Sequence, residues 1–194
     1  MAINPAFLVA DDVTVEQKAT IPGAEVTTIH LATGWNFISV PKNLASGHNN
    51  FTVLLSGISF SSVWGYNATT GWIHITNSST TVVVLDGYWI AATAPGTINL
   101  TYASGGQTLP PSKKLTGKAW NAIGFSSTSA TGLSAVATLK SVEGSWTNLL
   151  GWDATGQSYE NAIIFQVNDA EKMYPGKGYW LWVTADDTLA GLSA

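Results

Sequence analysis

The feature that most constrains this chain is an internal repeat, because two copies of one sequence pattern are expected to fold alike. Three short phrases of the first half return in the same order in the second half: 31–38 as 115–123, 65–69 as 151–155, and 87–89 as 178–180. The spacing is also kept, since Trp35 lies 31 positions before Tyr66 and Trp120 lies 32 positions before Trp152. The repeat therefore predicts two similar modules in tandem.

The matched phrases set the expected module boundaries. Copy one is expected over residues 25–102 and copy two over residues 113–194. Residues 103–112 contain two glycines and two prolines, which is typical of a linker. Residues 1–24 form an N-terminal extension without a signal-peptide pattern. Its alternating run at 13–21 suits an edge strand, paired either with its own module or with a neighbouring subunit. The alternative expectation is a mobile terminus.

Both copies are expected to form short strands. Runs rich in Val, Ile, Thr and aromatic residues are bounded by Gly, Asn, Asp and Pro, which is the pattern of strands and turns. In copy one the expected strands are 26–31, 35–40, 62–66, 72–75, 88–93 and 97–102. The predicted fold class is therefore mainly β, with two similar sandwich-like or barrel-like modules that each carry one short helix.

The helix of each copy is predicted from the spacing of its apolar residues. In copy one, apolar residues fall at i, i+3, i+4 and i+7 from Phe51, which places them on one helix face. Asn50 is a candidate N-cap, and Gly57 is a candidate end. In copy two, a helix is expected between a cap at Ser134 and a stop at Gly144.

The low charge of the chain restricts its partners. Charged residues make up 10% of the chain and the net charge is −4, whereas soluble domains contain about 25% charged residues. No basic patch suits a nucleic-acid partner, and no run of about 18 apolar residues suits a membrane span. A surface of Ser, Thr, Asn and Gly is common where a protein packs against its own copies or carries glycans. It is equally compatible with a neutral soluble domain.

Four phrases carry a resemblance to a known group of proteins: Gly34-Trp35-Asn36-Phe37-Ile38-Ser39-Val40-Pro41, Leu85-Asp86-Gly87-Tyr88-Trp89-Ile90, Trp120-Asn121-Ala122-Ile123-Gly124-Phe125 and Gly176-Lys177-Gly178-Tyr179-Trp180-Leu181. They resemble a tandem β module of large cell-surface proteins of methanogenic archaea, of the S-layer or adhesin type. The resemblance covers about residues 29–194. It implies a non-catalytic, extracellular protein at the cell surface, with glycans as a candidate modification and with copies of itself or other surface proteins as partners.

The sequence offers no pattern of catalytic or metal-binding residues. His30, His48 and His74 lie far apart, and none has the spacing of a metal or protease motif. Oxygen-bearing side chains recur between Asp153 and Glu160, but their spacing departs from that of a calcium loop. The chain has no cysteine. No cofactor, no metal and no enzymatic activity are therefore expected.

The tryptophans divide into matched and unmatched positions. Four match across the copies and are therefore expected in the module cores: Trp35, Trp89, Trp120 and Trp180. Trp64, Trp72 and Trp146 have no matching tryptophan, so they are candidate contact residues for sugar rings or for a protein partner. An equally open alternative is that they fill the interface between the two modules. Trp182 is also unmatched and is expected to fill the interface between the modules.

Four Asn-x-Ser/Thr sequons are candidate glycosylation sites: Asn50, Asn67, Asn77 and Asn99. All four lie in copy one, and their side chains are expected to be open to solvent. The sequence as a whole predicts a non-enzymatic structural component of an extracellular surface layer, sheath or adhesin, with self-assembly as a candidate property. The alternative from another class is a carbohydrate-binding module, which would need several unmatched tryptophans exposed on one face.

Overall fold

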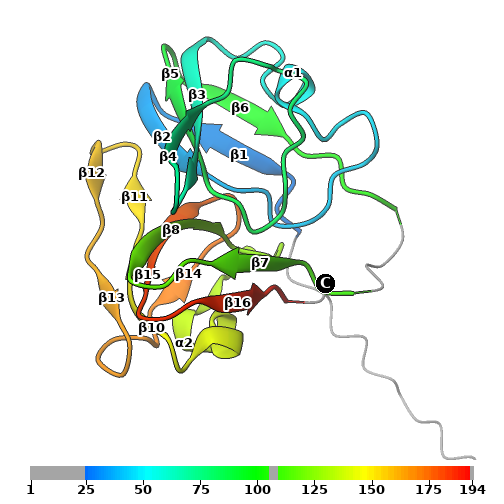
Figure 1. The fold of residues 1–194 in the computed structure, drawn as a ribbon. Helices are drawn as coiled ribbons and strands as arrows, with labels where there is room; N and C mark the ends of the chain where they lie inside the picture. Colours follow the sequence, from blue (N-terminus) through cyan, green and yellow to red (C-terminus); the bar gives the residue numbers. More distant parts are fainter. Residues whose placement is uncertain (1–24, 105–108, 193–194) are drawn as a thin grey trace, which may run out of the picture.

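The structure is a computed structural model that describes residues 25–104 and 109–192, as Figure 1 shows. The predicted N-terminal extension, residues 1–24, lies outside the described residues. The elements of the first half are β1 (Thr28–Leu31), β2 (Gly34–Ile38), α1 (Phe51–Leu54), β3 (Phe60–Asn67), β4 (Gly71–His74), β5 (Tyr88–Ala92) and β6 (Gly96–Asn99). They form a four-stranded antiparallel sheet in the order β2-β5-β3-β4 and a separate β1–β6 pair.

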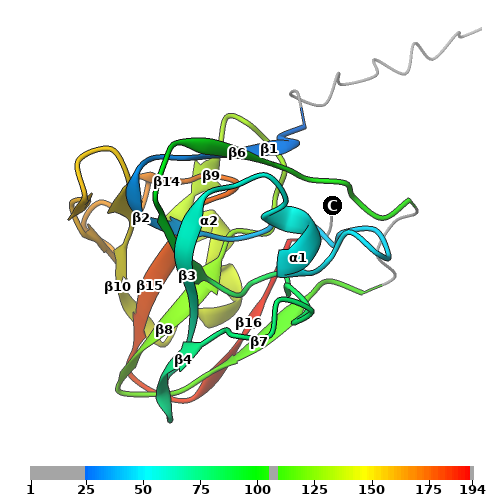
Figure 2. The same cartoon turned by 90° about the horizontal axis from the view of Figure 1, so that it is seen from above.

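The second half repeats this arrangement with added short pairs. Its elements are β7 (Ser112–Leu115), β8 (Ala119–Gly124), β9 (Leu133–Ser134), α2 (Ala135–Thr138), a 3-10 turn (Lys140–Val142), β10 (Trp146–Leu150), β11 (Trp152–Asp153), β12 (Ser158–Tyr159), β13 (Ile163–Ile164), β14 (Lys172–Met173), β15 (Gly178–Val183) and β16 (Asp187–Ala190). The sheet order is β8-β15-β10-β13, and β7 pairs with β16. Figure 2 shows β8, β15 and β10 side by side.

The predicted fold class is confirmed. In both sheets the strand of the Trp-Asn phrase (β2 or β8) pairs with the strand of the Gly-Tyr-Trp phrase (β5 or β15). That strand pairs in turn with the strand that follows the helix (β3 or β10). The two halves therefore have the same strand order, as the repeat predicts. The sheets of the described residues are sandwich-like and close into no barrel.

The helices are short and only partly as predicted. Asn50 caps α1, because its side-chain oxygen accepts a hydrogen bond from Val53 N–H at 3.1 Å. Ser134 precedes α2 but makes no side-chain capping bond. The segment after it divides into α2 and the 3-10 turn, so the single helix predicted there is wrong. Within the described part of the chain, no helix is long and apolar enough to cross a membrane.

The Trp-Asn phrase has a structural reason that is the same in both halves. The Asn36 side chain accepts a hydrogen bond from Ala32 N–H at 2.9 Å and donates to the Ala32 and Gly34 carbonyl oxygens at 2.8 and 3.0 Å. Asn121 makes the matching bonds in the second half, all between 2.9 and 3.1 Å. Each buried amide thus holds the turn that leads into its own strand, β2 or β8.

The Gly-Tyr-Trp phrase likewise has one role in both halves. Tyr88 is buried, and its hydroxyl accepts a hydrogen bond from Val83 N–H at 3.0 Å. Tyr179 is also buried and accepts from Tyr174 N–H at 2.8 Å. Burial raises the pKa of both phenols above the ordinary value. Each tyrosine therefore stays neutral and ties the incoming segment to the central strand of its sheet.

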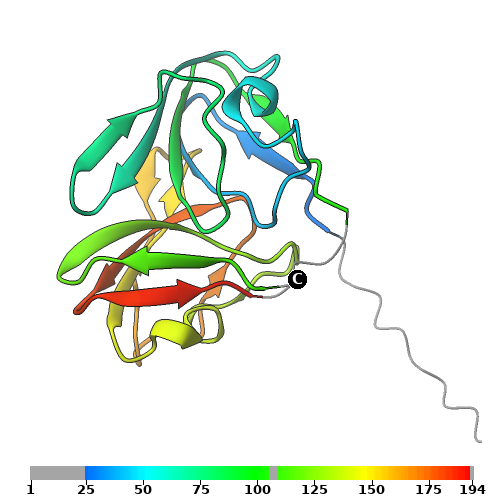
Figure 3. The ribbon, with the colours of Figure 1, turned by 45° about the vertical axis from the view of Figure 1, so that its right-hand side comes forward.

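The two halves contact each other through matching backbone bonds, and Figure 3 shows one half above the other. Ser39 N–H donates to the Gly176 carbonyl oxygen at 3.1 Å, and Gly124 N–H donates to the Leu85 carbonyl oxygen at 2.8 Å. Ser39 and Gly124 are matching positions of the repeat, as are Leu85 and Gly176. An approximate two-fold axis therefore relates the halves. Most of their buried apolar residues form one continuous core, and a smaller cluster contains Phe37, Trp89, Ala122 and Trp180.

Phe37 lies between the halves and is 3% exposed. Its ring stacks on Trp89 with a centroid distance of 4.5 Å and lies 5.4 Å from Trp180 of the other half. A Cβ atom at Gly87 would lie 2.7 Å from this ring, and one at Gly178 would lie 2.5 Å from it. Only glycine thus leaves room for the ring at these positions. The residue that matches Phe37 in the second half is Ala122, so one ring fills the shared space.

Candidate functional site

Strand alternation brings a set of aromatic rings to the face of each sheet that lies away from its own half's core. Tyr88 and Ile90 of β5 point into the core, so Trp89 between them points to the opposite face. Trp35 of β2 also points to this opposite face, because the next residue of the strand, Asn36, is buried and adjacent strand residues point to opposite faces. The equivalent strands of the second half direct Trp180 to the corresponding face.

These rings line a hollow of about 740 Å³ at the junction of the two halves. Its lining consists of Trp35, Ser62, Trp64, Trp72, Trp89, Trp152 and Tyr159. The first five residues come from the first half, and the last two come from the β11–β12 hairpin of the second. Figure 1 shows this hairpin standing beside the first half. The volume lies within the range of about 300–1,000 Å³ that is usual for small-molecule sites.

Trp89 forms the floor of the hollow and the other rings form its walls. Trp89 is 6% exposed, whereas Trp35 and Trp72 are 40% and 54% exposed. The planes of Trp35, Trp72 and Trp152 stand at 78°, 69° and 68° to that of Trp89. Edge-to-face contact between indoles is favourable, so contact with Trp89 supports these three walls without a ligand. The hollow is therefore largely preformed.

A second, smaller hollow adjoins the first. It has a volume of about 350 Å³ and is lined by Tyr66, Trp72, Trp120, Leu150, Tyr159 and Trp180. Trp72 and Tyr159 line both hollows. We call the two hollows together the aromatic groove. Among the residues that the structure describes, no charged side chain lines either of them.

The β11–β12 hairpin is held against the first half by polar contacts to one residue. Trp35 N–H donates to the Gln157 side-chain oxygen at 2.8 Å, and the Trp35 carbonyl oxygen accepts from Gln157 at 3.0 Å and from Trp152 Nε1 at 2.8 Å. Gln157 has φ of 51°, in the left-handed region that non-glycine residues rarely adopt. These bonds offset the energetic cost of the left-handed conformation of Gln157. They also fix Trp35 and Trp152, two walls of the larger hollow.

The structure places the predicted contact tryptophans in different environments. Trp64 and Trp72 line the aromatic groove. Trp146 does not, and its assignment as a contact residue is wrong: it is 1% exposed and packs 5.0 Å from Phe165 in the core. The reason is a register shift in β10 between Trp146 and Asn148, which turns Trp146 to the core face.

The core assignment of the matched tryptophans is also only partly right. Trp89 and Trp180 are buried, but they are buried between the halves and not inside either one. Trp35 is a wall of the groove. The alternation of the Tyr-Trp-Ile sequence in β5 could have indicated this position for Trp89. Its Tyr and Ile occupy the core face, so the Trp between them must face the other way. Trp182 stacks edge-to-face on Trp120 of its own half at 5.4 Å.

The sequon asparagines lie at or near the surface. Asn67, Asn77 and Asn99 are exposed, whereas Asn50 is half-buried by its capping role. Asn67 and Asn77 accept hydrogen bonds from the backbone N–H two residues later, at 2.8 and 3.0 Å. These Asx turns present both side chains on exposed loops. Glycosylation at these positions stays a prediction.

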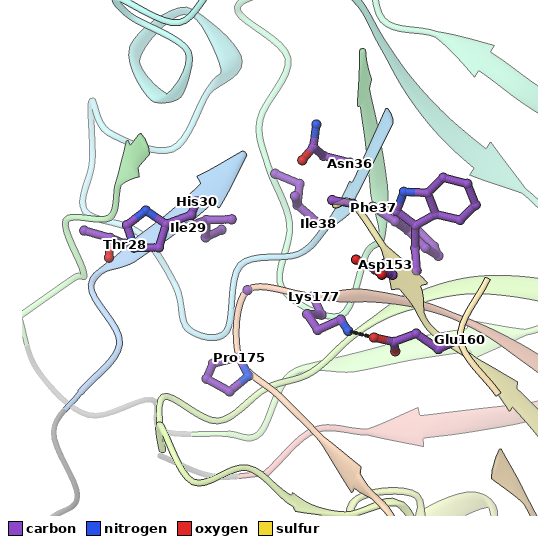
Figure 4. A pocket seen from close by; sticks show the side chains of 13 residues that line it. Thr28, Ile29, His30, Asn36, Phe37, Ile38, Asp153, Glu160, Pro175 and Lys177 are labelled. Carbon is purple, nitrogen blue, oxygen red and sulfur yellow. Dashed lines mark hydrogen bonds and ion pairs between the residues drawn. The ribbon is translucent and has the colours of Figure 1, made fainter. Parts of the chain in front are cut away.

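A polar pocket of about 300 Å³ lies on another side of Trp152, and Figure 4 shows its side chains. Several of its polar side chains already have partners. Glu160 forms an ion pair with Lys177, and His30 Nδ1 lies 3.2 Å from the Thr97 hydroxyl. Asp153 accepts a hydrogen bond from Thr155 N–H at 2.9 Å. Among residues 25–104 and 109–192, no three His, Asp or Glu side chains are grouped as metal ligands.

No protein-family model, no curated protein and no solved structure matches this chain. The aromatic groove is therefore the feature of the molecule that most directly points to a function.

Proposed function

We propose that this chain is a non-enzymatic carbohydrate-binding module of an extracellular surface protein. The observation that carries the proposal is the aromatic groove, in which exposed indole faces surround an uncharged hollow at the junction of the halves. A pyranose ring has an apolar face of C–H groups and a rim of hydroxyl groups. The apolar face can stack on Trp35 or Trp72, and the hydroxyls of Ser62 and Tyr159 can bond to the rim.

The charge of the groove favours a sugar over a nucleic acid. Proteins that stack nucleic-acid bases on aromatic side chains also track the phosphates with a positively charged groove. Within residues 25–104 and 109–192, no Lys or Arg lines the aromatic groove, and the net charge of the chain is −4. An uncharged ligand is therefore the better match. A proline-rich peptide is the competing uncharged ligand, since such segments dock in aromatic-lined grooves.

We expect Trp72→Ala to weaken binding to a neutral polysaccharide by about tenfold to a hundredfold. The range is set by analogy with nucleic-acid bases, for which stacking on one aromatic side chain contributes roughly 1–3 kcal/mol. Trp72 is 54% exposed, so its removal leaves the fold intact. The measurement is affinity electrophoresis and calorimetry with soluble β-glucan, xylan and mannan. Sedimentation with cellulose and chitin covers the insoluble forms.

A matched pair of tyrosines supplies the control. Tyr159 lines both hollows and is 54% exposed, whereas Tyr174 lies outside the groove and is 42% exposed. Tyr159→Ala is expected to weaken binding and Tyr174→Ala is not. If no neutral glycan binds, or if a proline-rich peptide binds in its place and depends on Trp72, the carbohydrate proposal is wrong.

The role as a self-assembling component of a surface layer stays a prediction from the sequence. It is supported by the low charge of the chain and by the resemblance of its phrases to surface modules. We expect the sedimentation coefficient of the full chain to rise with concentration if copies associate. A monomer at all concentrations up to millimolar would contradict self-assembly and would leave the glycan proposal intact.

A further inference from the structure

The two hollows of the aromatic groove are built from matching positions of the repeat. Trp35 and Trp89 of the larger hollow correspond to Trp120 and Trp180 of the smaller one. The hairpins extend the match, because Tyr66 pairs with Trp72 in β3–β4 as Trp152 pairs with Tyr159 in β11–β12. The approximate two-fold axis therefore exchanges Trp72 with Tyr159, the two residues that line both hollows.

The ring geometry repeats as well. Trp152 lies 5.1 Å from Trp89 at 68°, and its counterpart Tyr66 lies 4.8 Å from Trp180 at 86°. The hairpin pairs are also alike, with Trp152 5.1 Å from Tyr159 and Tyr66 5.2 Å from Trp72. Each hollow thus has a tryptophan floor and a perpendicular aromatic wall supplied by the opposite half.

We infer that the aromatic groove binds one neutral oligosaccharide across both hollows, with a sugar ring stacked in each. This inference rests on the proposed function. The hollows adjoin through Trp72 and Tyr159, so a ligand in one can continue into the other. Because a two-fold axis relates the two hollows, a ligand chain that crosses it runs in opposite directions relative to the two sets of lining residues. Stacking on the apolar face of a sugar tolerates this reversal, whereas a fixed set of hydrogen bonds would not.

The two hollows are not equal, and the difference sets an order of strength. Trp64 of the larger hollow is replaced by Leu150 in the smaller one, and the volume falls from about 740 to about 350 Å³. The larger hollow is therefore the stronger subsite and holds the end of a short ligand. The smaller hollow adds affinity only for ligands that reach it. Neutral sugars are selected, because an acidic sugar would find no cation among the lining residues.

The test measures affinity against chain length for cello-oligosaccharides and chito-oligosaccharides, from monosaccharide to hexasaccharide. For the unmodified chain, we expect at least a tenfold rise in affinity once the ligand is long enough to reach the second hollow. Trp120→Ala should remove this rise and leave the affinity for the shorter ligands unchanged. Trp35→Ala should weaken every member of the series. Thermal unfolding of both variants checks that each still folds.

A second variant keeps the test sharp if Trp120→Ala fails to fold. Leu150→Trp restores in the smaller hollow the ring found in the larger one, and it should increase affinity for the longer members alone. Affinity that is independent of length, or a Trp120→Ala variant with an unaltered length dependence, would overturn the two-hollow inference while the proposed function stands. Absence of binding to every sugar by the unmodified chain would overturn the proposed function itself.

Discussion

Phe37→Ala is expected to lower the free energy of unfolding by about 3–5 kcal/mol, as is typical when a buried phenylalanine is truncated. The ring is 3% exposed and fills the space between the halves. Its neighbours there are the glycines at 87 and 178, which have no side chain to move into the void. The measurement is chemical denaturation followed by tryptophan fluorescence, which reports directly on Trp89 and Trp180.

Phe60 provides the matched control, because it is a strand phenylalanine that is 41% exposed. Phe60→Ala should cost less than about 1 kcal/mol, since surface substitutions rarely exceed that amount. The same denaturation curves also test whether the halves unfold together. One transition is expected for the unmodified chain, because its apolar core is continuous. A Phe37→Ala variant as stable as Phe60→Ala would contradict the packing described here.

Asn36→Ala and Asn121→Ala are expected to destabilise the fold by similar amounts, roughly 3 kcal/mol each, because each leaves backbone groups of a tight turn without their partner. Both side chains are buried, and both make three hydrogen bonds of 3.1 Å or less to the preceding turn. Since the two sites are equivalent, the two losses should agree within about 1 kcal/mol.

Asn99 is a suitable control for the two asparagine variants, because its side chain is exposed. Asn99→Ala should change stability by no more than about 0.5 kcal/mol. Asn36→Asp keeps an acceptor oxygen but turns a carboxylate oxygen toward the Ala32 and Gly34 carbonyl oxygens, so it should destabilise the fold at least as much as Asn36→Ala. Equal stability of Asn36→Ala and Asn99→Ala would show that the amide does not hold the turn.

The sequence predicts the elements well where the signal is local. The Asn50 cap and the alternating strands depend on neighbours a few positions away, and the structure contains them. The common strand order follows from the matched phrases, since equal sequences at equal spacing favour equal pairing. These features need only periodicity and repetition to be recognised.

The groove was less predictable, because it depends on how the halves associate. Trp64 and Trp72 could be singled out as unmatched residues, but Trp35 matches Trp120 and Trp152 matches Tyr66, so neither gave such a signal. Trp146 shows the converse. Trp146 lies an even number of positions before Leu150, so strict strand alternation would place both side chains on the groove face. A bulge of one residue turns the Trp146 side chain inward. Bulges and the packing of one half on another arise from distant contacts that a repeat alone does not encode.

The reciprocal bonds of Ser39 with Gly176 and of Gly124 with Leu85 have a consequence for how far the two halves can differ in sequence. Such an exchange is the isologous contact of a symmetric homodimer. In a dimer encoded by one gene, every change would appear twice, and both hollows would stay identical. Covalent fusion of the two copies frees each to vary alone. The pairs Phe37 with Ala122 and Trp64 with Leu150 differ in this way, and a homodimer of identical copies could not place a single ring near the axis.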